Sequence, residues 1–152
     1  MGIALSQSEI DDFMLNSVTC ILCINRKGKP PLPLPMWFGW ENNTIYINTA
    51  AASKKAAPLR EDPNVAVLVE AGHQYYELKT VLCMGQARIN ENQDEVSFEA
   101  WSNWLHANKP LYKQTYADKF PPHLERFYQQ QRMTLAIKPH SITTWDFSKI
   151  KV

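Results

Sequence analysis

Residues 49–63 read TAAASKKAAPLREDP and form the most informative stretch of this chain. They follow an alternating run at 44–48, TIYIN, whose period of two predicts a β-strand. We expect Ser53 to be the N-cap of a short helix whose first turn carries Lys54 and Lys55. Because the helix macrodipole already makes that end positive, two added cations favour a bound anion, typically a phosphate. The alternative is a solvated helix start with two surface lysines.

Strand-like patterns lie on both sides of this segment. They occupy residues 18–25, 30–40, 44–49, 64–70, 75–90 and 133–147. The turn at 26–29 contains Gly28 and predicts that the first two strands form a hairpin. Prolines in the 30–40 segment remove backbone donors, which confines that strand to a sheet edge or leaves it irregular. Gly85 lies inside the 75–90 segment, where it predicts a β-bulge or a close backbone approach.

Two helical regions complete the pattern. Ser6 and Glu9 form a capping box before an amphipathic helix at 9–16. A helical insert covers about residues 92–132 and precedes the last strand. Antiparallel-type strands with short links predict a mainly β fold with peripheral helices, a small closed or partly closed β-barrel of about six strands. We expect residues 1–152 to form a single domain, because no linker-like segment divides them.

Composition argues against several classes of function. The chain has 152 residues, of which 45% are hydrophobic and 20% charged, with a net charge of +1. This charge argues against electrostatically driven binding to nucleic acid, and no apolar run is long enough to cross a membrane. The first residues lack a secretory pattern, and the three cysteines form neither a disulfide framework nor a metal set. We therefore expect a cytoplasmic protein with no metal site.

Four stretches, taken in order, are similar to the motifs of a known family. They are PLPMWF at 33–38, the segment 49–65, the strand at 76–88 with its VLCMGQA run, and TWD at 144–146. With these motifs the chain resembles the FMN-binding split-barrel proteins related to pyridoxamine 5′-phosphate oxidase. The resemblance extends over residues 5–149, which is nearly the whole chain.

This resemblance implies a homodimeric split barrel with two FMN sites at the subunit interface. It assigns a set of residues to cofactor binding: Pro35, Met36 and Trp37 under the isoalloxazine ring, Asn48 and Thr49 beside the ribityl chain and phosphate, Ser53, Lys54 and Lys55 at the phosphate, Thr80 and Val81 near the ring, and Trp145 reaching the ring from the partner chain. Such a set suits a flavin, which needs charge at its phosphate and flat apolar surface at its ring.

The chain also departs from that family's pattern. Pro58 stands where relatives often carry asparagine, at the point where the helix would pack over the phosphate. The C-terminal signature of true pyridoxamine phosphate oxidases, which contains arginine and histidine, is missing. We therefore expect a different small-molecule substrate, with the 92–132 insert shaping its pocket or the rim of the dimer.

The leading hypothesis is an FMN-dependent oxidoreductase that transfers hydride or electrons to an unidentified small-molecule substrate. The flavin would carry this chemistry, so no acid–base pair is required and no catalytic residue is assigned. A deazaflavin in place of FMN is a close variant. A non-catalytic flavin, deazaflavin or haem-type binding or sensor module is the alternative, because no clear acid–base residue marks the site. A dimer that has lost its cofactor is a third hypothesis.

Overall fold

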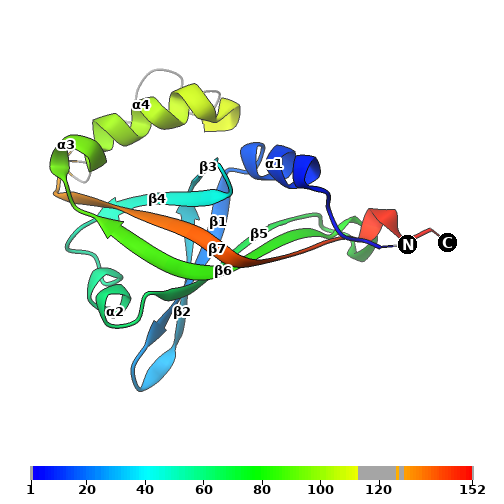
Figure 1. Ribbon diagram of the computed structural model, residues 1–152, viewed down its shortest axis with the longest axis horizontal. Helices are drawn as coiled ribbons and strands as arrows, with labels where there is room; N and C mark the ends of the chain where they lie inside the picture. The colour runs from blue at the N-terminus through cyan, green and yellow to red at the C-terminus, as the bar shows by residue number, and fades with distance from the viewer. Residues whose placement is uncertain (1, 113–125, 127–128, 152) are drawn as a thin grey trace.

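A computed structural model gives the fold of residues 2–112, 126 and 129–151 (Figure 1). The strands are β1 Thr19–Arg26, β2 Lys29–Trp37, β3 Gly39–Glu41, β4 Thr44–Ala50, β5 Asn64–Ala71, β6 Lys79–Asn90 and β7 Arg132–Asp146. The helices are α1 Gln7–Leu15, α2 Ala56–Glu61, α3 Gln93–Val96 and α4 Phe98–Asn108, with 3-10 turns η1 Tyr75–Glu77 and η3 Phe147–Lys149. The mainly β class with peripheral helices is confirmed. None of the helices in these ranges has the length and apolarity of a membrane span.

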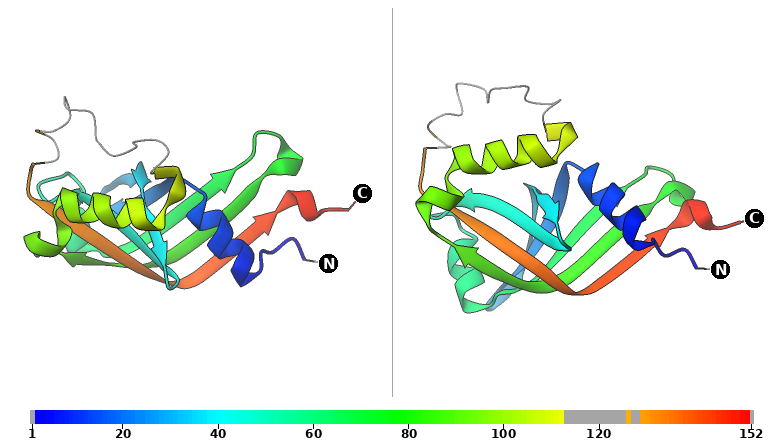
Figure 2. Two further views of the ribbon diagram at one scale, coloured as in Figure 1. Left: turned by 90° about the horizontal axis from the view of Figure 1, so that it is seen from above. Right: turned by 45° about the horizontal axis from the view of Figure 1, so that its top comes forward.

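All seven strands belong to one antiparallel sheet, in the order β2-β1-β5-β6-β7-β4-β3. The two edge strands, β2 and β3, are consecutive in the chain and are separated only by Phe38. The sheet therefore has to curl until its edges approach each other, and β2 indeed contacts β4. Figure 2 shows the resulting curvature, with α4 lying across the outer face of the sheet. The predicted barrel is confirmed.

Two strand boundaries differ from the sequence prediction. The 30–40 segment is not one strand, because it divides at the fully buried Phe38 into β2 and β3. Its prolines lie in β2, which is an edge strand as their missing donors require. The strand expected at 75–90 begins only at Lys79, since η1 occupies the preceding residues. The second half of the helical insert expected at about 92–132 falls largely at 113–125 and 127–128, outside the described residues.

Gly85 marks a β-bulge, as the sequence predicts. The register between β6 and β7 shifts between Met84 and Gly85. A Cβ atom on Gly85 would lie 3.0 Å from the Lys138 carbonyl oxygen and 3.2 Å from the Pro139 Cα atom. Only glycine allows this approach without movement of the backbone of β7, and the bulge increases the local twist of the sheet.

The core has two parts. The inner part fills the barrel with alternating apolar side chains such as Ile45, Ile47 and Leu135, all of which are fully buried. The second part lies on the outer face, where α4 contributes the buried Trp101 and Leu105. Burial of such large apolar groups attaches the helix to the sheet, at about 25 cal/mol per Å² removed from water.

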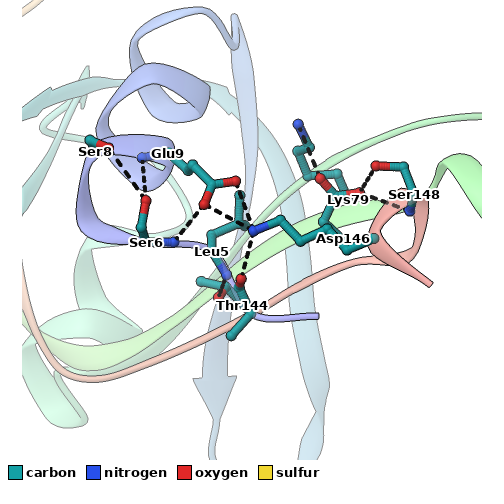
Figure 3. Close-up of polar contacts among 10 residues, drawn as sticks. Leu5, Ser6, Ser8, Glu9, Lys79, Thr144, Asp146 and Ser148 are labelled. Atoms are coloured by element: carbon teal, nitrogen blue, oxygen red, sulfur yellow. Dashed lines mark hydrogen bonds and ion pairs between the residues drawn. The ribbon is translucent and has the colours of Figure 1, made fainter. Parts of the chain in front are cut away.

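The two chain ends are joined by polar contacts (Figure 3). The predicted capping box is confirmed, because Ser6 and Glu9 exchange side-chain to backbone hydrogen bonds at the start of α1. Lys149 Nζ donates to Glu9 Oε1 at 2.9 Å, and this bond together with those from Ser6 lowers the pKa of Glu9 to about 2. The Leu5 amide donates to Thr144 Oγ1 at 2.8 Å. Residues before α1 are therefore attached to the end of β7.

A buried amine connects the end of α4 to the closure point of the barrel. Lys109 is only 1% exposed, and its Nζ donates to the Phe38 carbonyl oxygen. The same atom lies 3.3 Å from the centroid of the Phe38 ring. Burial lowers the pKa of Lys109 to about 7, against an opposing influence of Cys20. The C-terminal end of α4 is thus held by the Lys109 amine, whose protonated form is disfavoured by burial.

We expect the Lys109→Met variant to lose a pH dependence of stability that the wild-type protein has. The pKa of Lys109 is about 7 in the folded protein against an ordinary value of 10.5. Between these values the unfolded chain binds the extra proton, so the free energy of unfolding increases with pH by on the order of 1 kcal/mol per unit. That stability is lost as the pH falls toward 7. Urea titrations between pH 7 and about 8.5 measure the slope, because the pKa of the buried Cys20 and Cys83 is raised from 9.0 to about 12 and these thiols contribute the opposite slope at higher pH.

Lys27→Met is the matched control, because Lys27 is exposed in the turn between β1 and β2. The control should keep the wild-type slope, whereas Lys109→Met should flatten it. A wild-type slope in Lys109→Met would show that the buried amine retains its proton throughout this range.

Candidate functional site

The segment after β4 forms a turn before its helix begins. The helix α2 starts at Ala56, and its N-cap is Lys55, which makes no side-chain capping bond. The prediction that Ser53 is the N-cap is therefore wrong, and Lys54 and Lys55 precede the first helical turn. The reason is a pair of turn bonds, Ser53 N to Ala50 O at 3.0 Å and Ala56 N to Ser53 O at 3.1 Å. These bonds use the Ser53 backbone before the helix starts.

The Ser53 side chain is nevertheless unusual. Its Oγ atom is buried and has no hydrogen-bond partner among the described residues. Buried hydroxyl groups in native structures are nearly always paired, and leaving one unpaired is costly. A hydroxyl of this kind can donate to a ligand oxygen. Ser53 therefore fits a bound acceptor better than it fits a helix cap.

Arg132 brings a second cation to this end of the sheet. Its position follows from the register of β4 and β7, which pairs Ala50 with Arg132. The residue is 5% exposed, and its Nε donates to Asn48 Oδ1 at 2.8 Å. Its guanidinium lies 5.6 Å from the Phe98 ring centroid. Sequence reasoning missed Arg132, because no local signal relates it to a turn so distant in the chain.

Lys55 is close enough to Arg132 for their charges to interact. The pKa of Lys55 is lowered, first by burial and second by the positive charge of Arg132. Lys54, by contrast, is exposed. Two like charges held near each other in a partly dehydrated place favour an anion between them. We call Ser53, Lys55 and Arg132 the phosphate-end cluster.

Asn48 and Thr49 lie beside this cluster, both 6% exposed. The Asn48 amide donates to the Val96 carbonyl oxygen at 2.7 Å and to Thr134 Oγ1 at 3.2 Å. Because its side-chain oxygen accepts a hydrogen bond from Arg132, Asn48 links β4 to α3 and β7. Its hydrogen bonds within the chain position Arg132. Its place beside the cofactor's ribityl chain, which the resemblance implies, stays a prediction.

A second group of predicted residues lies at the other end of the sheet. Thr80 pairs with Trp145 across β6 and β7, next to the fully buried Val81. Near the other end of β7, Met133 pairs with Thr49 of β4. The part of β7 between Met133 and Trp145 corresponds to about 40 Å of extended strand. Figure 1 shows β7 running from the α3 end of the sheet toward the chain termini. One chain therefore does not bring the two groups together.

Asp146 follows Trp145 and is held in place. Burial raises its pKa, but hydrogen bonds from Ser148 and the charge of Lys79 outweigh this, so the pKa of Asp146 is lowered. The Ser148 amide donates to Asp146 Oδ1 at 2.9 Å, and Lys79 Nζ lies 3.5 Å from Oδ2 (Figure 3). This ionised carboxylate fixes the last residues of β7 against η3, and with them the backbone that carries Trp145.

The third predicted group is the end of β2. Pro35 is exposed, while Met36 and Trp37 are partly buried. The Trp37 ring meets the Tyr112 ring edge to face, with centroids 4.9 Å apart. Trp37 is thus part of the aromatic packing on the outer face of the barrel. Its neighbours Pro35 and Met36 occupy an edge strand that is open to a ligand or a second chain.

Comparison with known proteins gives the family. The sequence matches the pyridoxamine 5′-phosphate oxidase family over residues 6–146. A search of curated proteins finds no match. The fold is similar to that of the conserved hypothetical protein Rv2991 from Mycobacterium tuberculosis, with a TM-score of 0.73, 26% identity, and coverage of 99% of this chain and 93% of that chain.

Two more distant structures share the fold. A FAD-binding protein from Mesorhizobium loti has a TM-score of 0.65 at 17% identity, with 93% of this chain and 94% of that chain covered. An F420 reductase has a TM-score of 0.66 at 15% identity, with 88% and 94% covered. The family match includes β1 to β7, the phosphate-end cluster and Trp145. The chain therefore belongs to the pyridoxamine 5′-phosphate oxidase family and has its split-barrel fold.

Proposed function

We propose that this chain binds a flavin through its phosphate at the phosphate-end cluster and acts as a flavin-dependent oxidoreductase. The observation that carries the proposal is the buried Ser53 hydroxyl, which has no hydrogen-bond partner among the described residues. It lies two positions before Lys55, whose pKa is lowered by burial and by the charge of Arg132. A phosphate would accept hydrogen bonds from these groups and offset the repulsion between the cations. The exposed Lys54 would add positive charge at the rim of the site.

The names of two similar structures support a flavin as the ligand class, since one is a FAD-binding protein and the other an F420 reductase. Within this class we propose FMN, in agreement with the split-barrel motifs of the sequence. A deazaflavin of the F420 type is the alternative cofactor. Both carry a phosphate next to a ribityl-type chain, so the phosphate-end cluster alone does not distinguish them.

The cofactor site is proposed to be shared by two copies of this chain. The phosphate-end cluster and Trp145 are separated by about 40 Å of β7, which is far longer than a flavin mononucleotide. Both groups can reach one cofactor when a second chain supplies Trp145 and the backbone of Thr80 and Val81, whose side chains are buried within their own chain. A two-fold homodimer would then hold two equivalent sites, because each chain presents both groups.

When bound, the flavin would supply hydride or electron transfer. The residues of this chain would bind and orient it. Lys55 and Arg132 would hold the phosphate, and the edge strand β2 at Pro35, Met36 and Trp37 would lie along the ring. A partly buried Trp145 from the partner subunit would limit the access of water to the ring. The substrate would be a small molecule that reaches the ring between the subunits.

We expect Lys55→Met to weaken the binding of FMN about tenfold or more, because a charge-assisted contact contributes roughly 1.5–3 kcal/mol. Riboflavin lacks the phosphate, so its affinity should be the same in wild-type and variant protein. Fluorescence titration of each flavin measures both dissociation constants.

Lys27→Met serves again as the exposed-lysine control and should bind both flavins as the wild type does. Equal losses for riboflavin and FMN in Lys55→Met would contradict the phosphate assignment. A wild-type protein that binds neither FMN nor F420 would support the hypothesis of a dimer without its cofactor.

Mixing of variant chains tests the shared site. Lys55→Met and Trp145→Ala homodimers should each bind FMN weakly, since every site lacks one group. In a randomly mixed sample half the dimers are heterodimers, and each has one intact site, so about one quarter of all sites should regain wild-type affinity. Titration before and after subunit exchange measures this recovery. No recovery in a sample shown to contain heterodimers would place both residues in one chain's site or in none.

Turnover separates an enzyme from a sensor module. We expect protein-bound FMN, once photoreduced without oxygen, to be reoxidised by a quinone or nitroaromatic acceptor faster than free reduced FMN is. Stopped-flow absorbance follows this reoxidation. Rates no faster than those of free FMN across such acceptors would favour the non-catalytic binding module.

A further inference from the structure

A cavity separate from the phosphate-end cluster lies between the α3–α4 helices and the outer face of the sheet. Its volume is about 470 Å³, which is within the range of small-molecule sites. Its walls include three aromatic side chains, Tyr46, Trp101 and Trp104, and two carboxylates, Glu41 and Glu95. No lysine, arginine or histidine is among the lining residues that belong to the described part of the chain.

The aromatic walls are held in a fixed arrangement. Trp101 and Trp104 stack with ring centroids 5.4 Å apart and an interplanar angle of 26°. Tyr46 meets Trp104 at 5.5 Å and 69°. A Cβ atom on Gly39 would lie 1.9 Å from the Trp104 ring, so only glycine at this position of β3 leaves room for the indole. The rings are therefore positioned before any ligand binds.

The carboxylates come from two different elements. Glu95 lies on α3, and its Oε2 accepts a hydrogen bond of 2.7 Å from the Asn90 amide at the end of β6. Glu41 ends β3. Both side chains are exposed and border the cavity where it meets solvent. A cavity with aromatic faces and an anionic rim disfavours phosphates and other anions.

We propose that this cavity binds a small organic cation that carries an alkylated ammonium group. Aromatic rings attract such a cation, and more strongly as it is desolvated. Carboxylates at the rim add Coulomb attraction without requiring a fixed hydrogen-bond geometry, which suits an ammonium group that has no N–H donors. A metal ion is not the proposed ligand, because most of the wall offers aromatic carbon rather than oxygen or nitrogen ligands.

The test compares choline with 3,3-dimethyl-1-butanol, which has the same shape but no charge. Isothermal titration of the full-length protein should give saturable choline binding at least tenfold tighter than binding of the neutral alcohol, the difference that about 1.4 kcal/mol produces. Glu95→Gln and Glu41→Gln should each weaken choline severalfold and leave the alcohol unchanged. Glu61→Gln is the matched control, since Glu61 is exposed on α2 and lines a different cavity.

Trp104 and Gly39 test the aromatic wall. Trp104→Leu should abolish choline binding, whereas Trp104→Phe should retain part of it. Gly39→Ala should weaken choline binding by displacing the indole, although it removes no contact to the ligand.

The two glutamine variants concern exposed side chains and should fold normally, so the test does not depend on the core substitutions. Equal affinity for choline and the neutral alcohol, no choline binding to the wild type, or wild-type affinity in the Glu41→Gln/Glu95→Gln double variant would each overturn the proposal.

Discussion

The buried contact between Arg132 and Asn48 is the interaction on which both proposed sites depend. A guanidinium that is 5% exposed must be paired with polar groups, and the Asn48 oxygen at 2.8 Å is its best-defined partner. Gln93 adds hydrogen bonds to the Arg132 backbone at 2.9 and 3.1 Å. Because the Asn48 amide also binds the Val96 carbonyl oxygen, one asparagine joins β4, β7 and α3. Removal of either partner would leave a buried polar group unsatisfied.

This contact divides the charge of the outer face into two regions. On one side, burial and then the charge of Arg132 lower the pKa of Lys55, and such like charges reduce stability unless an anion offsets them. On the other side, the α3–α4 helices cover a cavity whose charged lining residues, within the described ranges, are Glu41 and Glu95. Local arrangements that lower stability without a structural benefit are typical of functional sites. In our proposals, the fold thus keeps an anion-binding end and a cation-binding cavity apart.

Much of the fold could be predicted from local sequence, while the candidate site could be predicted only in part. Alternating apolar residues, the prolines of β2 and the bulge at Gly85 each leave a signal within a few residues, and the structure confirms them. The prediction of Ser53 as an N-cap failed although serine is a common cap. Its backbone is used by a turn, and α2 begins where Ala56 and Leu59 can be buried. Packing of that helix against the barrel decided its first residue.

The sequence by itself determined most of the strand segments, that the proline-rich strand lies at a sheet edge or is irregular, and that a turn with serine and lysine follows β4. These follow from backbone donors, side-chain period and turn chemistry, which act over short distances. Only the tertiary structure decided that Arg132 joins Lys55, that Trp145 lies at the far end of the sheet, and that Trp104 rests on Gly39. Each of these depends on strand register or helix packing between distant parts of the chain, for which no local pattern carries information.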